Sequence, residues 1–376
     1  MARLIALDMP ASKTFVDLVQ RAWSNGDAVL PIDQRLPSAG KKRLLDAMAP
    51  SEIIDASFTA STLPNGRPMQ DGDALVIASS GSTGSPKGII HTHSSILSGA
   101  RASASRLQLS ASDHWLVCIP VSHVGGFSVI ARALHTGAAL TLLPAFDVAA
   151  VQEAAKNGAT HTSLVATALS RIDNSLFKSI LLGGSSAPDN LPSNVITTYG
   201  MTETGGGAVY NGEPLDNVEI KINDGEIFLR CPMLMRAYRD DQSIPIEDGW
   251  YATGDLGEIL DDGKLSVHGR QTDLIITGGE NVWPSVVENS LASHPMVNQV
   301  VVRGMPDTTW GQRVVAYVVL NDSAQTSEAK LLSDFRDHVK QSLPAFYAPQ
   351  QVVVLAEIPR TSLGKVDVQA LTSLNS

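Results

Sequence analysis

Short apolar runs recur along the central part of the chain, and polar or amphipathic stretches separate them. Residues 74–78, 116–119, 139–143 and 179–182 are nearly all apolar and are predicted to be buried strands. The segment 128–135 between two of them is predicted to be a helix. Strands that alternate with helices are typical of doubly wound, mainly parallel sheets. The pattern therefore predicts an α/β fold for a large N-terminal domain.

Turn signals further along the chain predict two hairpins. Asp224-Gly225 stands between residues 219–222 and 226–230, and Asp261-Asp262-Gly263 precedes residues 264–268. Asp-Gly pairs between apolar segments favour tight turns between antiparallel strands. The first 73 residues, by contrast, are predicted to be a short helical and irregular lead-in.

A second domain is predicted to begin just after Gly269-Arg270, which divides the chain into residues 1–270 and 271–376. About one hundred residues are enough for a small α+β unit with a core of its own. The elements expected in this C-terminal domain are a helix at 284–293, strands at 297–304 and 314–320, a helix at 327–342 and a strand at 351–355.

Composition narrows the class of protein. The chain has 376 residues, of which 43% are hydrophobic, and a net charge of −10. An acidic chain with no basic run is a poor partner for nucleic acid. No apolar stretch is long enough to cross a membrane, and the first residues do not resemble a secretory signal. With only Cys118 and Cys231, expected as buried thiols, a cytoplasmic location is predicted.

Residues 79–88 carry the strongest chemical signal. Glycines let the backbone approach a ligand, while hydroxyls and a lysine offer donors for a polyphosphate. The donors and turn residues of this run are Ser79, Ser80, Gly81, Ser82, Thr83, Gly84 and Lys87. Ser85-Pro86 separates the last glycine of the turn from Lys87, so the run is not a Walker A loop. The competing interpretation is a solvated Gly/Ser loop.

Two later runs combine turn residues with carboxylates. Residues 198–204 place Tyr199, which is suited to stack on a base, close to Glu203, an oxygen ligand for Mg²⁺. Residues 249–257 place Asp255 between glycines, where it is suited to accept hydrogen bonds from a ribose diol. Each run taken alone is equally consistent with an ordinary exposed turn.

Two runs near the end of the chain complete the series. Gly269 to Asp273 contains Arg270 and leads to Gly278-Gly279, and residues 359–365 end in Lys365. A lysine on such a loop is usually a solvated surface residue, so its significance depends on the other runs.

These five runs, in this order, resemble the adenylate-forming superfamily of acyl- and aryl-CoA ligases, luciferases and peptide-synthetase adenylation domains. The resemblance covers about residues 74–367. It implies a large N-terminal domain and a small, mobile C-terminal domain that rotates between two half-reactions about a hinge at Thr272. Many relatives carry Asp or Lys at the hinge, so the threonine is a departure from the pattern.

The resemblance also implies ATP, Mg²⁺ and coenzyme A as ligands, with a role for each matching residue. Residues 79–88 would form the phosphate loop, Thr202 would meet the α-phosphate and Glu203 would bind Mg²⁺. Asp255, assisted by Arg270, would take the ribose hydroxyls, and Lys365 would bridge the carboxylate and the α-phosphate. The segments implied around adenine and pantetheine contain Gly184, Ser185, Ser186, Tyr199, Gly200 and Met201 for adenine, and Gly278 and Gly279 for pantetheine.

The 78 residues before the phosphate loop are few for this superfamily, and this compact form resembles actinobacterial o-succinylbenzoate–CoA ligases of menaquinone biosynthesis. Residues 120–126 look like their Pro-x-x-His-x-x-Gly segment beside the acyl group. The resemblance implies that the acid is lined by Ser122, His123, Gly125, Gly126, Gly205 and Gly206. His123 is otherwise interpreted as a packed core imidazole.

The acid itself stays open at this point. The second carboxylate of o-succinylbenzoate needs a donor, and Arg132, Arg171 and Ser122 are all candidates. The alternatives are another aryl- or short-chain acyl-CoA ligase, an enzyme that loads a carrier protein, and a non-catalytic AMP-binding protein. A homodimer is compatible with the sequence.

Overall fold

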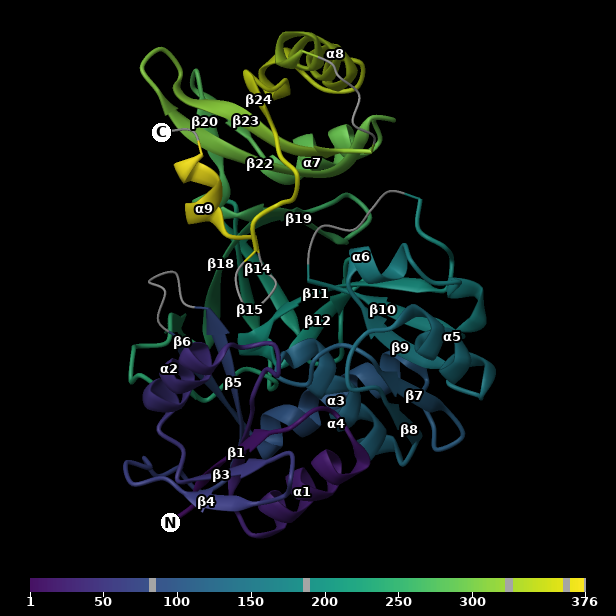
Figure 1. Cartoon of the computed structure of the whole chain (residues 1–376), viewed down its shortest axis with the longest axis vertical. Coiled ribbons are helices and arrows are strands. Elements are labelled where there is room, and N and C mark those ends of the chain that lie inside the picture. The colour runs from purple at the N-terminus through teal and green to yellow at the C-terminus, as the bar shows by residue number, and fades with distance from the viewer. Residues whose placement is uncertain (81–85, 185–189, 322–326, 361–365, 375–376) are drawn as a thin grey trace. The chain divides into compact units, whose positions relative to one another are not determined.

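The chain divides into two compact units in a computed structural model that describes all residues except 81–85, 185–189, 322–326, 361–365 and 375–376 (Figure 1). The first unit comprises Met1–Lys221, Phe228–Ala252 and Leu260–Leu265. The second comprises Ile222–Ile227, Thr253–Ile259 and Ser266–Ser376. Each has its own buried apolar core, as expected for a large and a small α/β domain.

The first sheet of the first unit contains strands from residues 1–73, so the prediction of a helical and irregular lead-in is right about helices but wrong about the segments between them. Its order is β16-β6-β5-β2-β1-β3-β4. Residues 4–7, for example, are all apolar and buried on both faces of the sheet. A run this short shows no hydrophobic periodicity, so the sequence alone cannot distinguish a strand from a helix there. The strands are β1 (Leu4–Asp8), β2 (Ala28–Pro31), β3 (Glu52–Asp55), β4 (Ala60–Thr62), β5 (Asp73–Ser80), β6 (Pro86–Thr92) and β16 (Ala237–Tyr238).

Two helices connect these strands, α1 (Lys13–Ser24) and α2 (Ser38–Met48). The Ser12 side chain accepts a hydrogen bond from the Phe15 amide at 3.1 Å and thereby caps the first turn of α1. Phe15, Val16 and Val19 are buried at helical spacing. The βα alternation keeps β1, β2, β3 and β5 parallel.

The second sheet has the order β13-β12-β11-β10-β9-β7-β8 and confirms the expected doubly wound pattern. Its strands β7, β8, β9, β10 and β11 run parallel to one another. At one edge β12 pairs antiparallel with β11, and β13 pairs antiparallel with β12. The strands are β7 (His114–Val117), β8 (Ala139–Leu142), β9 (His161–Leu164), β10 (Ser179–Leu182), β11 (Val195–Met201), β12 (Gly206–Tyr210) and β13 (Glu213–Pro214).

Helices α3 (His93–Leu107) and α4 (Val124–Thr136) pack against each other (Figure 1). Helix α3 also contacts β5 and β6 of the first sheet, whereas α4 contacts β7 and β9 of the second. The two helices therefore link the two sheets of the first unit. Helices α5 (Val148–Lys156) and α6 (Ala166–Leu169) follow β8 and β9.

A third sheet has the order β14-β15-β18-β17, with β19 paired to β18. Asp224 and Gly225 both have positive φ angles, 49° and 79°, as a two-residue hairpin of type I′ requires. These angles confirm the first predicted hairpin, and the pairing of β19 with β18 on either side of Asp261-Asp262-Gly263 confirms the second. The strands are β14 (Glu219–Asn223), β15 (Glu226–Arg230), β17 (Ile246–Glu247), β18 (Trp250–Ile259) and β19 (Leu265–Arg270).

The second unit has a sheet of order β21-β20-β23-β22, with β24 beside β23. The predicted C-terminal elements are confirmed, although β22 and β23 are longer than expected because they pair along most of their length. The elements are β20 (Ile275–Thr277), β21 (Glu280–Val282), α7 (Pro284–Ala292), β22 (Val297–Asp307), β23 (Gly311–Leu320), α8 (Glu328–Lys340), β24 (Gln351–Val354) and α9 (Val368–Ser373).

Two expectations from composition can be compared with the described part of the chain, and the expectation of buried thiols holds for Cys118 only. No helix there has the length and apolar character that a membrane crossing demands. Cys118 and Cys231 are free thiols; Cys118 is buried and Cys231 is partly exposed.

Candidate active site

Lys87 and Glu203 come together around a residue that the sequence did not single out. The Tyr238 hydroxyl donates to Glu203 Oε1 at 3.3 Å, and Lys87 Nζ lies 3.3 Å from the centre of the Tyr238 ring. Burial, followed by the nearby Glu203 carboxylate, raises the pKa of Tyr238 to about 12. A neutral phenol therefore stands between a cation and an acid, both of which were expected to bind ATP or its metal.

Tyr238 is placed there by the pairing of distant strands. β16 runs antiparallel to β6, with Tyr238 opposite Ile89. β6 itself carries Lys87 and pairs with β5, so that Ser79 lies opposite Lys87 and Ser80 opposite Pro86. The hairpin thus holds both ends of the expected phosphate loop. The remaining residues expected there, Gly81, Ser82, Thr83 and Gly84, lie outside the described residues, as do Ser185, Ser186 and Lys365.

β11 ends in the segment expected to meet adenine and the α-phosphate. A bulge follows Tyr199, which is partly buried, and Gly200 then pairs with Gly207 of β12. A Cβ atom on Gly200 would lie only 2.1 Å from the Gly206 carbonyl oxygen, so only glycine permits this approach. A 3₁₀ turn over Thr202–Thr204 follows Met201, and the Thr204 hydroxyl accepts from the Met201 amide at 2.9 Å. This turn presents Thr202 and Glu203 at the end of the strand.

A cavity of about 30 Å³ lies beside this turn, inside the first unit. Gly205 and Gly206, both expected to contact the acid, form part of its wall together with Gly207. Helix α4 contributes Arg132. The other lining residues include Val124, Phe127, Ser128 and Ala131 of α4, and His91, Ser95 and Tyr210. The cavity therefore brings together the glycine segment and one of the three candidate donors for a second carboxylate.

Arg132 is a buried cation, with 4% of its surface exposed. One guanidinium nitrogen donates to Ser163 Oγ at 3.0 Å, and the Cζ atom lies 4.7 Å from the Trp115 ring. Its Nε has no hydrogen-bond partner among the described residues, and no ion pair of Arg132 is found among them. Burial lowers the pKa of Arg132, because the charged form is separated from water.

Arg171 and Ser122, the other two candidates, are not among the residues that line this cavity. The guanidinium of Arg171 lies 5.3 Å from the Phe146 ring and is exposed. Ser122 is buried, and its hydroxyl has no partner among the described residues.

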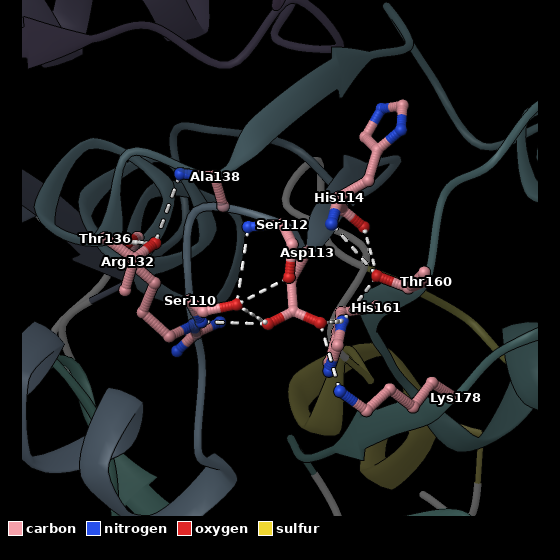
Figure 2. Close-up of polar contacts among 10 residues, drawn as sticks. All are labelled: Ser110, Ser112, Asp113, His114, Arg132, Thr136, Ala138, Thr160, His161 and Lys178. Carbon is pink, nitrogen blue, oxygen red and sulfur yellow. Dashed lines mark hydrogen bonds and ion pairs between the residues drawn. The ribbon is translucent and has the colours of Figure 1, made fainter.

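A polar network around Asp113 reaches His161, whose ring lies against that of Trp115. Figure 2 shows Asp113 between Ser110 and the pair His161 and Lys178; Asp113 accepts from the Ser110 amide at 2.8 Å and from Lys178 Nζ at 3.1 Å. The His161 ring lies 5.1 Å from that of Trp115. Burial chiefly lowers the pKa of His161 to about 4, so the imidazole is neutral near pH 7. This network supports the ring on which Arg132 rests.

His123 lies at the start of α4, two residues before Gly125. Gly126 is tightly enclosed, because a Cβ atom there would lie 2.3 Å from the Pro120 carbonyl oxygen. His123 Nε2 lies 2.8 Å from a guanidinium nitrogen of Arg35 and 3.4 Å from Asp33 Oδ2. Neither Asp33 nor Arg35 was predicted to belong to the site, since both fall within the supposed lead-in.

Asp255 and Arg270 form a pair in the second unit. Arg270 Nε lies 2.9 Å from Asp255 Oδ1, and a second guanidinium nitrogen donates to the Thr253 carbonyl at 2.7 Å. The Asp255 amide donates to Thr253 Oγ1 at 3.0 Å. β18 and β19 thus hold the carboxylate in a fixed position, as a ribose ligand would need.

Gly278 and Gly279 form the turn between β20 and β21. Both have positive φ angles, 60° and 86°, which glycine adopts readily. The Trp310 ring packs over Gly278, where a Cβ atom would lie 2.8 Å from the indole. Gly278 is therefore covered by the indole, whereas the space beside Gly279 is open.

Comparison with known proteins assigns the family. Residues 11–239 match the AMP-binding enzyme family, and residues 286–365 match the AMP-binding enzyme C-terminal domain. A Mycobacterium tuberculosis protein named "Probable 2-succinylbenzoate--CoA ligase" is 36% identical over 81% of this chain and 85% of its own length. The 2-succinylbenzoate–CoA ligase of Bacillus cytotoxicus is 35% identical over 77% of this chain and 68% of its own length.

Solved structures show the same architecture. The o-succinylbenzoate CoA synthetase (MenE) of Bacillus subtilis, in complex with the acyl-adenylate intermediate OSB-AMP, matches with a TM-score of 0.85 and 28% identity, over 98% of this chain and 88% of that chain. ATP-bound MatB from Rhodopseudomonas palustris shares the fold at 21% identity, with a TM-score of 0.86, over 100% of this chain and 89% of that chain. The chain therefore belongs to the AMP-binding enzyme family of adenylate-forming ligases.

Proposed function

We propose that the chain activates o-succinylbenzoate with ATP, releasing pyrophosphate, and then transfers the acyl group from the adenylate to coenzyme A, releasing AMP. The relatives from M. tuberculosis, B. cytotoxicus and B. subtilis carry this substrate in their names. The observation in the chain itself that best supports this acid is the buried Arg132 at the wall of the cavity.

A buried guanidinium without a carboxylate partner is costly, because burial removes its hydration. Arg132 has stacking and hydroxyl contacts, but no ion pair among the described residues. An acid with a second carboxylate would supply the missing negative charge. Gly205 to Gly207 would leave room for a flat aromatic ring beside it. Arg132 is therefore our choice among the three candidate donors.

Activation of the acid brings two anions together, a carboxylate and a triphosphate. We assign Lys87 and the hydroxyls at the ends of the phosphate loop to the phosphates, Thr202 to the α-phosphate, and Lys365 to the bridge between the two reactants. Positive charge and donors placed where charge develops lower the barrier, and holding the reactants in line removes much of its entropic part.

The residues present suit a magnesium ion. Glu203 is a partly exposed carboxylate beside the Lys87 hairpin, and Mg²⁺ is commonly held by one or two carboxylates together with substrate phosphates. When bound, the ion would neutralise phosphate charge. Tyr238, through its hydroxyl, would keep Glu203 oriented toward that position.

The remaining roles follow the same family pattern. Asp255, held by Arg270, would accept the ribose hydroxyls, and Tyr199, Gly184, Gly200 and Met201 would surround adenine. Gly278 and Gly279 would lie beside pantetheine during thioester formation. Residues 271–376 are proposed as the mobile domain. A cytoplasmic enzyme, a homodimer and the absence of a nucleic-acid partner also remain proposals.

The test is pyrophosphate release across a panel of acids, followed by thioester formation with coenzyme A. We expect the highest kcat/KM for o-succinylbenzoate. A maximum on benzoate or on a short-chain fatty acid would replace the proposed acid with one of the alternatives. Adenylate formation without transfer to coenzyme A, but with transfer to a carrier protein, would favour the carrier-loading alternative.

A further inference from the structure

Asp33, Arg35 and His123 form a connected set of three side chains in the first unit. Asp33 and Arg35 follow β2, and His123 precedes α4. Arg35 donates from Nε to Asp33 Oδ1 at 2.9 Å and from a terminal nitrogen to Oδ2 at 2.6 Å. The same terminal nitrogen lies 2.8 Å from His123 Nε2.

The position of the guanidinium is fixed. A two-pronged contact with a carboxylate sets both the plane and the direction of an arginine. The Asp33 side chain is only 3% exposed, and its Oδ1 also accepts from the Arg35 amide at 3.0 Å. Burial by itself raises the pKa of Asp33, but the hydrogen bonds from the Arg35 side chain and amide hold it well below its usual range. The carboxylate therefore stays ionised and keeps the arginine in place.

This geometry determines the proton position on the imidazole. An arginine side chain has donors and no acceptor. The terminal nitrogen of Arg35 uses one hydrogen for Asp33 and has its second available for His123 Nε2. Nε2 must then accept, so the proton of the neutral ring lies on Nδ1.

The other ring nitrogen is available for a ligand. Nδ1 of His123 has no hydrogen-bond partner among the described residues, and the side chain is 33% exposed. His123 directly precedes Val124, and that residue and Ser128 of the same helix line the cavity. The Nδ1–H donor of His123 thus lies at the start of α4, the helix that lines the cavity proposed to hold the acid.

We propose that Arg35, oriented by Asp33, fixes His123 as the neutral Nδ1–H tautomer, so that His123 donates a hydrogen bond to the acyl oxygen during thioester formation and does not act as a base toward the thiol. The identity of this ligand rests on the proposed function, whereas the tautomer does not. In that step the carbon–sulfur bond forms, the bond to the AMP oxygen breaks, and the thiol proton is released to solvent. Asp33 and Arg35 are positioning residues.

The first experiment reads the tautomer directly. The chain has nine histidines, so ¹⁵N-histidine NMR of the full-length protein, with His123→Asn to assign the signal, resolves this ring. We expect the Nδ1–H pattern in the wild type and in Arg43→Ala, an exposed-arginine control on α2. Arg35→Ala should mix the two tautomers. An Nε2–H ring in the wild type, or no change in Arg35→Ala, would overturn the proposal.

The second experiment reads the donor role through thioester formation from supplied acyl-adenylate. His123→Ala should slow this step roughly 100-fold, the scale for removing a donor to a developing oxyanion. His123→Asn should lose much less, because its amide places a donor near the position of Nδ1. Arg35→Lys keeps the positive charge but loses the two-pronged contact with Asp33. Its rate of thioester formation should lie between those of the wild type and Arg35→Ala. Equal losses in the Asn and Ala variants would contradict a donor and indicate a base.

Failure of the proposed function and failure of the tautomer inference give different results. A wild type that activates none of the acids would remove the proposed function, yet the NMR result would still decide the tautomer. A wild type that is active on o-succinylbenzoate but has the wrong tautomer would remove only this inference.

Discussion

Two buried arginines of the first unit, Arg239 and Arg132, are nearly equally hidden from solvent, at 3% and 4% exposure, yet their surroundings differ. Arg239 is surrounded by acceptors. Its guanidinium donates to the carbonyls of Met48, Ala49, Arg67 and Pro68 and contacts the sulfur of Met69. Burial, followed by the charge of Arg67, lowers its pKa to about 10, but its donors have partners.

Arg132 has few partners for the same charge. It interacts with the hydroxyls of Ser163 and Tyr210 and with one aromatic face, and it lines a cavity. The difference shows that burial alone does not separate a structural cation from a ligand-binding one. The number of satisfied donors separates them, because each unsatisfied buried donor costs stability that a bound anion would restore.

The largest effect should be on folding and should belong to Arg239. Arg239→Met would remove the donor of four carbonyls, one buried and three in partly buried hydrogen bonds, and we expect the free energy of unfolding to fall by about 3 kcal/mol. Urea unfolding measures this value. Arg132→Met should be far less destabilising, because few partners are lost. Equal losses in both variants would erase the distinction.

The next effect should be on the acid and should belong to Arg132. Arg132→Met should lower kcat/KM for o-succinylbenzoate roughly 30- to 100-fold, which corresponds to about 2–3 kcal/mol for a charged hydrogen bond. The KM for ATP should stay close to the wild-type value. Arg171→Met is the matched variant; a greater loss there would move the second-carboxylate site to Arg171.

A smaller effect should appear when the substrate is changed instead of the enzyme. An analogue that lacks the ring carboxylate should be used at least about tenfold less well by the wild type. In Arg132→Met this preference should disappear, since the two changes remove the same contact and their effects should not add. Full additivity would show that Arg132 and the carboxylate do not meet.

The smallest effect should be on His161, behind Trp115. The charge of Arg132 is one of the causes that lower its pKa, after burial. Removal of a nearby cation favours the protonated ring, so the pKa of His161 should rise slightly in Arg132→Met and stay unchanged in Arg239→Met. NMR titration of His161 tests this shift.

The same histidine implies a pH dependence of stability. Its folded-state pKa of about 4 lies below the ordinary 6.5, so the unfolded chain binds the proton first as the pH falls. Its contribution to stability should therefore decline between about pH 6.5 and pH 4. A His161→Gln variant should show a weaker decline, and an identical curve would contradict the buried neutral ring.

The sequence could reveal residues whose chemistry is local. Lys87, Glu203, Asp255 and Arg270 stand in short runs of glycines, hydroxyls and charges, and such runs carry their own turn geometry. The C-terminal elements were equally accessible, because long periodic segments specify their own type of structure.

The tertiary structure decided what depends on contacts between distant segments. Strands β1 to β4 are too short to show a period, so only their pairing reveals a sheet in place of a lead-in. Tyr238 reaches Glu203 because β16 pairs with β6, and Arg35 reaches His123 across 88 positions of the chain. The residue types in each loop indicate its chemistry. Packing alone determines which buried donors lack a partner after folding, and this difference distinguishes Arg132 from Arg239.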